Sequence, residues 1–194
     1  TLDKDFFENA RRKLDKKKPK EKPFVPKPYQ KNAITLAHKH FVKENNSRGK
    51  LIFPCGSGKS LTGFWMMEKL KANSTLVAVP SLSLVKQTLE VYLKQVVTKN
   101  KTVKWLCICS DEGIGKSDDV VTYTRDLPLS CTTDPNYIKK WLKENKNDNI
   151  IIFTTYQSGR LIAEASKSLK FTFDLGVYDE AHKTVGKNEN LFSY

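Results

Sequence analysis

The sequence has no long apolar run, and this absence excludes a membrane-spanning helix, which needs about 18 consecutive apolar residues. No apolar stretch follows the first charged residues, so we expect no signal peptide there. Hydrophobic residues make up 39% of the 194 residues, which is enough for a core. We therefore expect a folded protein without a membrane partner.

Cysteine is scarce, and the four cysteines lack the spacing of a metal site. They stand at positions 55, 107, 109 and 131, with no C-x-x-C pair and no histidine at zinc-ligand spacing near them. Cys107 and Cys109 lie in an apolar run, where both should point to one face of a strand. We expect free thiols and a cytoplasmic location, because the cytoplasm keeps thiols reduced.

Arginine is rare as well and supplies only five of the 34 basic residues. The net charge of +13 nevertheless indicates a polyanionic partner, with nucleic acid as the foremost candidate. A general enrichment in lysine, scattered over the surface, is the alternative explanation. Composition alone leaves both open.

Residues 1–27 form a region apart, with ten basic and five acidic residues. Apolar residues at helical spacing favour a short helix at its start, and Pro19, Pro23 and Pro26 favour an extended linker after it. We interpret residues 1–27 as a basic helix and linker arm. It either contacts phosphates, joins an upstream domain or is simply solvated.

Residues 28–194 alternate between helical and strand patterns, with an irregular insertion near 110–133. Short apolar strands separated by helices predict an α/β fold with a mostly parallel sheet covered by helices on both faces. The predicted helices are 29–45, 59–71, 82–97, 134–144 and 157–169, and the predicted strands are 50–53, 75–79, 103–109, 150–154 and 173–178. Asp134 as N-cap and Pro135 at the first helical position mark the start of the fourth helix.

Residues 54–60, Pro-Cys-Gly-Ser-Gly-Lys-Ser, predict a phosphate-binding loop between a strand and a helix. Gly56 and Gly58 let backbone N–H groups turn inward, and the following helix points its positive end at the phosphates. Lys59 would reach the β- and γ-phosphates, and the Ser60 hydroxyl would bind Mg²⁺. The pattern G-x-x-x-x-G-K-[ST] requires glycine where Phe53 stands, so this loop is a variant.

A second G-x-G-K-S sequence, at 113–117, is interpreted as a surface loop. Carboxylates flank it on both sides and a strand-like run follows it, so no helix N-terminus is available to offset their charge.

An apolar strand ends directly in two carboxylates, Asp179 and Glu180. Asp179 can bind Mg²⁺, and Glu180 can orient and deprotonate an attacking water. Paired acids at a strand end also occur as ordinary helix N-terminal residues. Their combination with the upstream phosphate loop favours the catalytic interpretation.

The sequence Asp-Glu-Ala-His at 179–182 resembles the DEAH box of superfamily 2 helicases and translocases, and 54–60 resembles their motif I. The resemblance implies a RecA-like domain that binds ATP and Mg²⁺. It implies that His182 links the γ-phosphate site to nucleic acid. It also implies that Gln30 contacts the adenine edge and that an aromatic residue, Tyr29 or Phe24, packs on the base.

Two further segments resemble the motifs with which this superfamily touches the nucleic-acid backbone. By resemblance, the nucleic-acid contacts are Pro80, Ser81, Lys86 and Gln87 in the first segment and Thr155, Tyr156, Gln157 and Ser158 in the second. Tyr156 could serve either as such a contact or as a core residue, and the core role is favoured.

The Thr-Tyr-Gln-Ser sequence at 155–158, ahead of the DEAH box, resembles the motors of restriction–modification enzymes. That resemblance implies DNA rather than RNA as partner. It implies a second RecA-like domain after residue 194, with nuclease or methyltransferase domains or subunits as further candidates. We therefore expect 28–194 to be an incomplete motor that binds ATP weakly and hydrolyses it negligibly when isolated, because the second domain contributes an arginine finger.

Two other functions fit parts of the sequence. An RNA helicase, or a viral or phage replication or transcription helicase, would carry the same motifs. A stand-alone P-loop phosphotransferase would need a substrate site within this chain, and the DEAH box argues against it.

Overall fold

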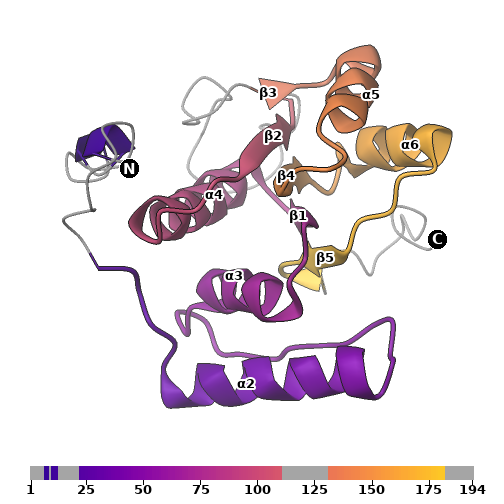
Figure 1. Ribbon diagram of the computed structural model, residues 1–194. Coiled ribbons are helices and arrows are strands. Elements are labelled where there is room, and N and C mark those ends of the chain that lie inside the picture. The colour runs from indigo at the N-terminus through magenta and orange to yellow at the C-terminus, as the bar shows by residue number, and fades with distance from the viewer. Residues whose placement is uncertain (1–6, 9, 13–21, 111–130, 182–194) are drawn as a thin grey trace. The chain divides into compact units, whose positions relative to one another are not determined.

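The computed structural model describes residues 7, 8, 10–12, 22–110 and 131–181 (Figure 1). The chain divides into two compact units, and each is described by itself. The first comprises residues 1–72 and 91–101, and the second comprises 73–90 and 102–194. Residues 7, 8 and 10–12 are helical, as the apolar spacing predicts.

The second unit contains a five-stranded sheet in the order β3-β2-β4-β1-β5. The four strand pairs among the described residues are all parallel, so the strands end at one common edge. The α/β class with a parallel sheet is thereby confirmed. The strands are β1 (Ser74–Val79), β2 (Lys104–Ile108), β3 (Cys131–Thr132), β4 (Ile150–Thr155) and β5 (Leu175–Tyr178).

Every residue of β1 and β4 is buried, which requires both faces of the sheet to be covered. On one face, α5 (Pro135–Glu144) and α6 (Gly159–Leu169) lie side by side, as Figure 1 shows. Their apolar residues form a single cluster with alternate strand residues. This cluster contains Leu76, Leu106, Ile108, Ile138, Leu142, Ile150, Ile152, Ile162 and Ala165.

The start of α5 follows the capping chemistry that its sequence predicts. Asp134 is the N-cap, and its Oδ1 accepts the N–H of Asn136 at 2.9 Å. Pro135 follows at the first helical position, where no backbone donor is needed. The predicted boundaries of this helix are confirmed.

The first unit contains α2 (Pro28–His38), the π-helix η1 (Lys39–Lys43) and α3 (Lys59–Leu70). The long helix α4 (Leu82–Thr98) ends in this unit. Glu68 of α3 forms ion pairs with Lys99 and Lys101 just beyond that end, and the Phe64 ring meets Tyr92 edge-on at 5.2 Å. These contacts fix α3, and with it the loop that precedes it.

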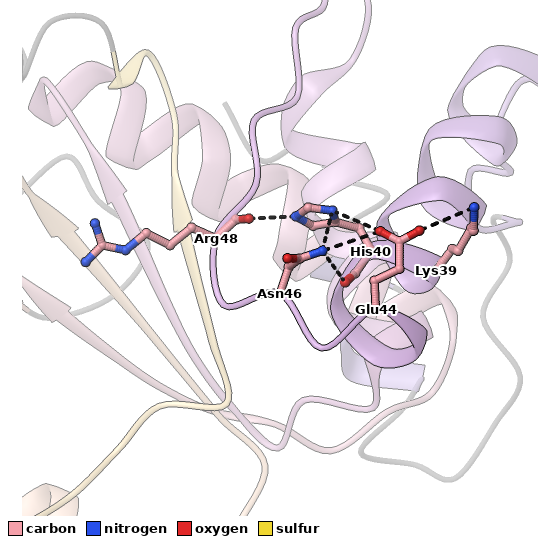
Figure 2. Close-up of polar contacts among 5 residues, drawn as sticks. All are labelled: Lys39, His40, Glu44, Asn46 and Arg48. Atoms are coloured by element: carbon pink, nitrogen blue, oxygen red, sulfur yellow. Dashed lines mark hydrogen bonds and ion pairs between the residues drawn. The ribbon is translucent and has the colours of Figure 1, made fainter.

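The turn after η1 is held by polar contacts around His40 (Figure 2). Its Nε2 lies 2.6 Å from the Arg48 carbonyl oxygen, and its Nδ1 lies 3.1 Å from the Asn46 amide nitrogen. Because the amide nitrogen donates, Nδ1 accepts and Nε2 donates. Glu44 adds an ion pair with Lys39 at 3.3 Å. His40 therefore closes this turn.

The strand predicted at 50–53 is wrong for this structure. Ile52 is 89% exposed, and the segment is irregular. A strand needs a neighbour to satisfy its backbone groups, and 50–53 pairs with none of the described strands. The strand β3 lies within the insertion near 110–133 that the sequence predicts to be irregular. None of the helices in the described residues has the length and apolarity to cross a membrane.

Candidate nucleotide and nucleic-acid site

The phosphate loop turns tightly at its two glycines. Gly56 has φ of 73° and Gly58 has φ of 80°, in the left-handed region that favours glycine. Between them, Ser57 folds back onto Pro54, whose carbonyl oxygen accepts the Ser57 hydroxyl at 2.7 Å. The loop therefore has its own internal support.

Two residues of α2 hold this loop from outside. The Tyr29 hydroxyl and the Gln30 side-chain amide both donate to the Ser57 carbonyl oxygen, at 2.9 and 3.0 Å. The Gln30 Oε1 accepts the Lys27 N–H at 2.8 Å, and Gln30 is only 3% exposed. The structure thus connects both predicted adenine contacts to the loop, and their contact with adenine stays a prediction.

The N-terminus of α3 meets the requirements of a phosphate site. Gly58 is its N-cap, and the Gly58 carbonyl oxygen accepts both the N–H and the hydroxyl of Thr62 at 3.0 Å. Lys59 and Ser60 stand in the first turn, which has no acidic residue. A helix of 12 residues directs its partial positive charge to this end, so the loop and helix fit a polyphosphate.

The acidic pair lies in the second unit, at the end of β5. The Asp179 N–H donates to the Ala78 carbonyl oxygen at 3.0 Å, which extends the ladder with β1 by one residue. The Glu180 N–H donates to the Asp179 Oδ1 at 3.0 Å, and Glu180 has φ of 54°. A non-glycine residue in this conformation is uncommon, and Lys71 and Lys170 adopt it at the C-terminal ends of α3 and α6.

The end of β4 brings residues 155–158 beside this pair through Tyr156. The Tyr156 hydroxyl donates to the Asp179 carbonyl oxygen, and Tyr156 is 6% exposed. Burial, followed by the charges of Asp179 and its neighbours, raises the pKa of Tyr156. The side chain therefore faces the acids, which favours the core alternative over a direct nucleic-acid contact.

The other predicted nucleic-acid residues differ in exposure. Thr155 and Ser158 are buried, and the Thr155 hydroxyl accepts the Ser158 N–H at 3.3 Å, whereas Gln157 is exposed. In the first segment, Pro80, Ser81 and Lys86 are half-buried and Gln87 is exposed. Because β1 and β4 are parallel neighbours, the two segments begin at the same edge of the sheet.

The comparison with protein families decides the classification. Residues 23–194 match the family described as "Type III restriction enzyme, res subunit". The chain belongs to this family.

Res-subunit relatives include a protein named "Probable helicase" in African swine fever virus. The chain is 27% identical to that of the Malawi tick isolate over 162 residues, which cover 83% of the chain and 16% of the viral protein. It is 26% identical to that of the Kenyan pig isolate, with the same coverage. The chain therefore corresponds to a small part of each viral protein.

Two solved structures resemble this Res-family domain. One is the ATP-dependent Type ISP restriction-modification enzyme LlaBIII bound to DNA, with a TM-score of 0.69, 27% identity and coverage of 86% of the chain and 11% of the enzyme. The other is a nuclease-deletion mutant of LlaGI in complex with a DNA substrate mimic, with a TM-score of 0.62, 26% identity and coverage of 83% and 13%. The RecA-like fold and the resemblance to restriction motors are confirmed.

Some predictions for this Res-family domain lie outside the described residues: the role of His182 and the second G-x-G-K-S sequence. No group of three or more His, Cys, Asp or Glu side chains suited to a metal occurs within the described segments. The hydroxyl of Ser60 and the carboxylate of Asp179 are hard oxygen ligands, the kind that Mg²⁺ prefers.

Sequence reasoning favoured a core role for Tyr156 but did not identify the acceptor of its hydroxyl, the Asp179 carbonyl oxygen. A tyrosine flanked by polar residues at a strand end gives no signal of the direction in which its hydroxyl points. Sequence reasoning also missed the hydrogen bond from the Thr62 hydroxyl to the Gly58 carbonyl oxygen. The position of Thr62, four residues after Gly58, is the signal that could have predicted this bond.

Proposed function

We propose that residues 28–194 are the first RecA-like ATP-binding domain of an ATP-dependent DNA translocase or helicase of restriction type. The observation that carries this proposal is the glycine-lined loop at the N-terminus of α3, which presents Lys59 and Ser60 with no acid in the first turn. Family membership and the likeness to restriction enzymes support it.

Each site residue has a proposed role in ATP hydrolysis. The loop residues Gly56, Ser57 and Gly58 cradle the phosphates, and Lys59 neutralises the β- and γ-phosphates. Glu180 takes a proton from the water that attacks the γ-phosphorus, with ADP as leaving group. The Mg²⁺ that accompanies ATP offsets phosphate charge, and Ser60 and Asp179 are its proposed ligands. Further proposed contacts are Tyr29 and Gln30 to adenine, and His182 between the phosphate site and nucleic acid.

The proposed nucleic-acid track follows the ends of β1 and β4. Ser81 immediately precedes α4 and accepts two hydrogen bonds from its first turn. Its hydroxyl accepts the Leu84 N–H at 3.4 Å, and its carbonyl oxygen accepts the Val85 N–H at 3.0 Å. The N-terminus of a helix suits a phosphate, and the exposed side chain of Gln157 suits a polar backbone contact. We propose DNA as partner because both similar restriction enzymes were solved with DNA or a mimic of it.

The remaining partners belong to the parent protein. We propose that a second RecA-like domain completes the motor, that nuclease or methyltransferase parts accompany it, and that the basic arm 1–27 precedes it. A location in the cytoplasm fits the four free cysteines.

A viral replication or transcription helicase is the second candidate, favoured by the likeness to the viral helicases. Measuring stimulation of the parent protein's ATPase by duplex DNA, single-stranded DNA and RNA separates the two. A duplex-DNA translocase responds most to duplex DNA. A preference for single strands or RNA would support the second candidate.

Two variants of the full-length parent test the ATPase assignment. Glu180→Gln should keep ATP binding and abolish turnover, and Lys59→Ala should lose ATP binding. Glu164→Gln and Lys69→Ala, at exposed positions of α6 and α3, are the matched controls and should behave as the unmodified protein. Full turnover by Glu180→Gln would show that the catalytic assignment is wrong.

A further inference from the structure

Tyr156 and Asp179 stand on opposite sides of the end of β1. The Tyr156 N–H donates to the Val79 carbonyl oxygen at 3.0 Å, and the Asp179 N–H donates to the Ala78 carbonyl oxygen at 3.0 Å. Each bond extends one parallel ladder by a residue, with β4 on one side and β5 on the other. The backbones of both residues are therefore fixed to the same strand.

The Tyr156 side chain then bridges the two ladders. Its hydroxyl donates to the Asp179 carbonyl oxygen, with the ring buried. That carbonyl belongs to the peptide group between Asp179 and Glu180, whose N–H donates to the Asp179 Oδ1. Because a peptide group is planar, one hydrogen bond to its oxygen orients the whole unit, and with it the start of both carboxylate side chains.

The conformation of Glu180 gives this bond a specific task. A φ of 54° is unfavourable for a residue with a side chain and persists only where the surroundings enforce it. The Tyr156 hydroxyl and the Asp179 Oδ1 hold the two ends of the peptide group that precedes Glu180. These two hydrogen bonds support the turn at Glu180.

The next residue along the chain faces the other way. Gln157 is exposed, and α6 begins two residues later at Gly159. One peptide group therefore joins this exposed position to the residue that holds the Asp179 carbonyl. The two sides of this short segment thus face the proposed track and the proposed catalytic acids.

We propose that Tyr156 is a positioning residue that couples nucleic-acid contact at the end of β4 to the orientation of Asp179 and Glu180. This inference rests on the proposed ATPase function of the parent protein. It replaces the direct nucleic-acid contact that the sequence predicts for Tyr156.

The test is Tyr156→Phe in the full-length parent, because phenylalanine keeps the buried ring and removes only the donor. ATP turnover is measured with and without duplex DNA, together with the KM for ATP and the DNA concentration that gives half of the maximal stimulation. We expect DNA-stimulated kcat to fall about tenfold, with both concentration parameters within about twofold of the unmodified protein. Tyr137→Phe, at an exposed site on α5, is the matched control and should change nothing.

A rescue variant separates the donor from the fold. Replacing Tyr156 with p-aminophenylalanine restores a donor at the same ring position and should recover most of the lost stimulation. If Tyr156→Phe does not fold, the p-aminophenylalanine variant becomes the test, because it keeps the proposed hydrogen bond. Normal stimulation by DNA in that variant supports the proposal, and lost stimulation overturns it.

Three results would overturn the inference. Normal stimulation of Tyr156→Phe would show that the hydroxyl is dispensable. A raised half-saturating DNA concentration with unchanged kcat would indicate direct nucleic-acid contact. An equal loss with and without DNA, accompanied by a lower Tm, would indicate a purely structural role. Failure of the ATPase assignment itself is visible separately, as turnover by Glu180→Gln.

Discussion

A Cβ on Gly58 would lie 2.8 Å from the Gln30 Nε2, so a side chain there would force the Gln30 amide to shift from the Ser57 carbonyl oxygen that it binds. Gly58 also has a positive φ and caps α3. The phosphate loop and the start of α2 are therefore matched to each other in shape, in addition to the hydrogen bonds that join them at Ser57.

This match predicts different effects for the two loop glycines. Both Gly58→Ala and Gly56→Ala place a side chain at positive φ, which costs on the order of 1–3 kcal/mol. The added methyl group meets Gln30 only at position 58, since a Cβ on Gly56 has nothing within 4 Å. Gly58→Ala should therefore unfold at lower denaturant concentration and bind ATP more weakly than Gly56→Ala.

The role of Gln30 in that difference can be isolated. In a Gln30→Ala background, the gap between the two alanine variants should shrink, because the atom that clashes is gone. A gap of unchanged size in equilibrium unfolding would show that Gln30 is not its cause.

Cys55 predicts a protection experiment. It is exposed within the phosphate loop, whereas Cys107 and Cys109 are buried. A hydrogen bond with Cys131, together with burial, raises the pKa of the Cys107 thiol and keeps it unreactive. Timed maleimide labelling with peptide mass spectrometry should modify Cys55 first, and ATP with Mg²⁺ should slow only that reaction. Equal labelling of Cys55 with and without ATP would contradict the placement of nucleotide at this loop.

Asp134 predicts a capping effect on α5. Asp134→Ala removes the acceptor for the Asn136 N–H and should lower the free energy of unfolding by about 1 kcal/mol. Asp134→Asn keeps an acceptor oxygen and should retain most of that stability. Urea unfolding followed by circular dichroism measures both, and an equal loss for the two variants would argue against capping.

The raised pKa of Tyr156 predicts a loss of stability in alkali. The unfolded chain ionises this phenol near its ordinary value of 10.0, while the folded chain keeps it neutral to higher pH. Its contribution is therefore complete below about pH 10 and declines above it. The stability advantage over Tyr156→Phe should shrink as the pH rises from about 10 to about 12 in urea unfolding. A constant advantage would show that the phenol is not held neutral.

Sequence reasoning succeeded where the signal is local. The Asp134-Pro135 pair gave the start of α5, and the glycine, lysine and serine of 56–60 gave the start of α3. Alternation of short apolar runs and helices gave the parallel sheet.

It failed where a partner distant in sequence decides the outcome. Residues 50–53 look like a strand, but pairing is a property of two segments, and their composition does not show whether a neighbour is present. The orientation of Tyr156 depends on Asp179 in the same way. The side-chain amide of Gln30 was assigned to a base by resemblance, and the contact that it makes with the Ser57 carbonyl has no local signature.

The shared register of β1 limits how sequences of this kind can change in length. Thr75 to Ala78 pair with both β4 and β5, so each of these residues is in step with two neighbours. Deleting one residue within 75–78 would shift Tyr156 and Asp179 relative to the end of β1. It would also turn the later side chains of β1 to the opposite face of the sheet. Insertions and deletions in relatives should therefore collect in the connections between strands, and alignments that place a gap inside β1 should be rejected.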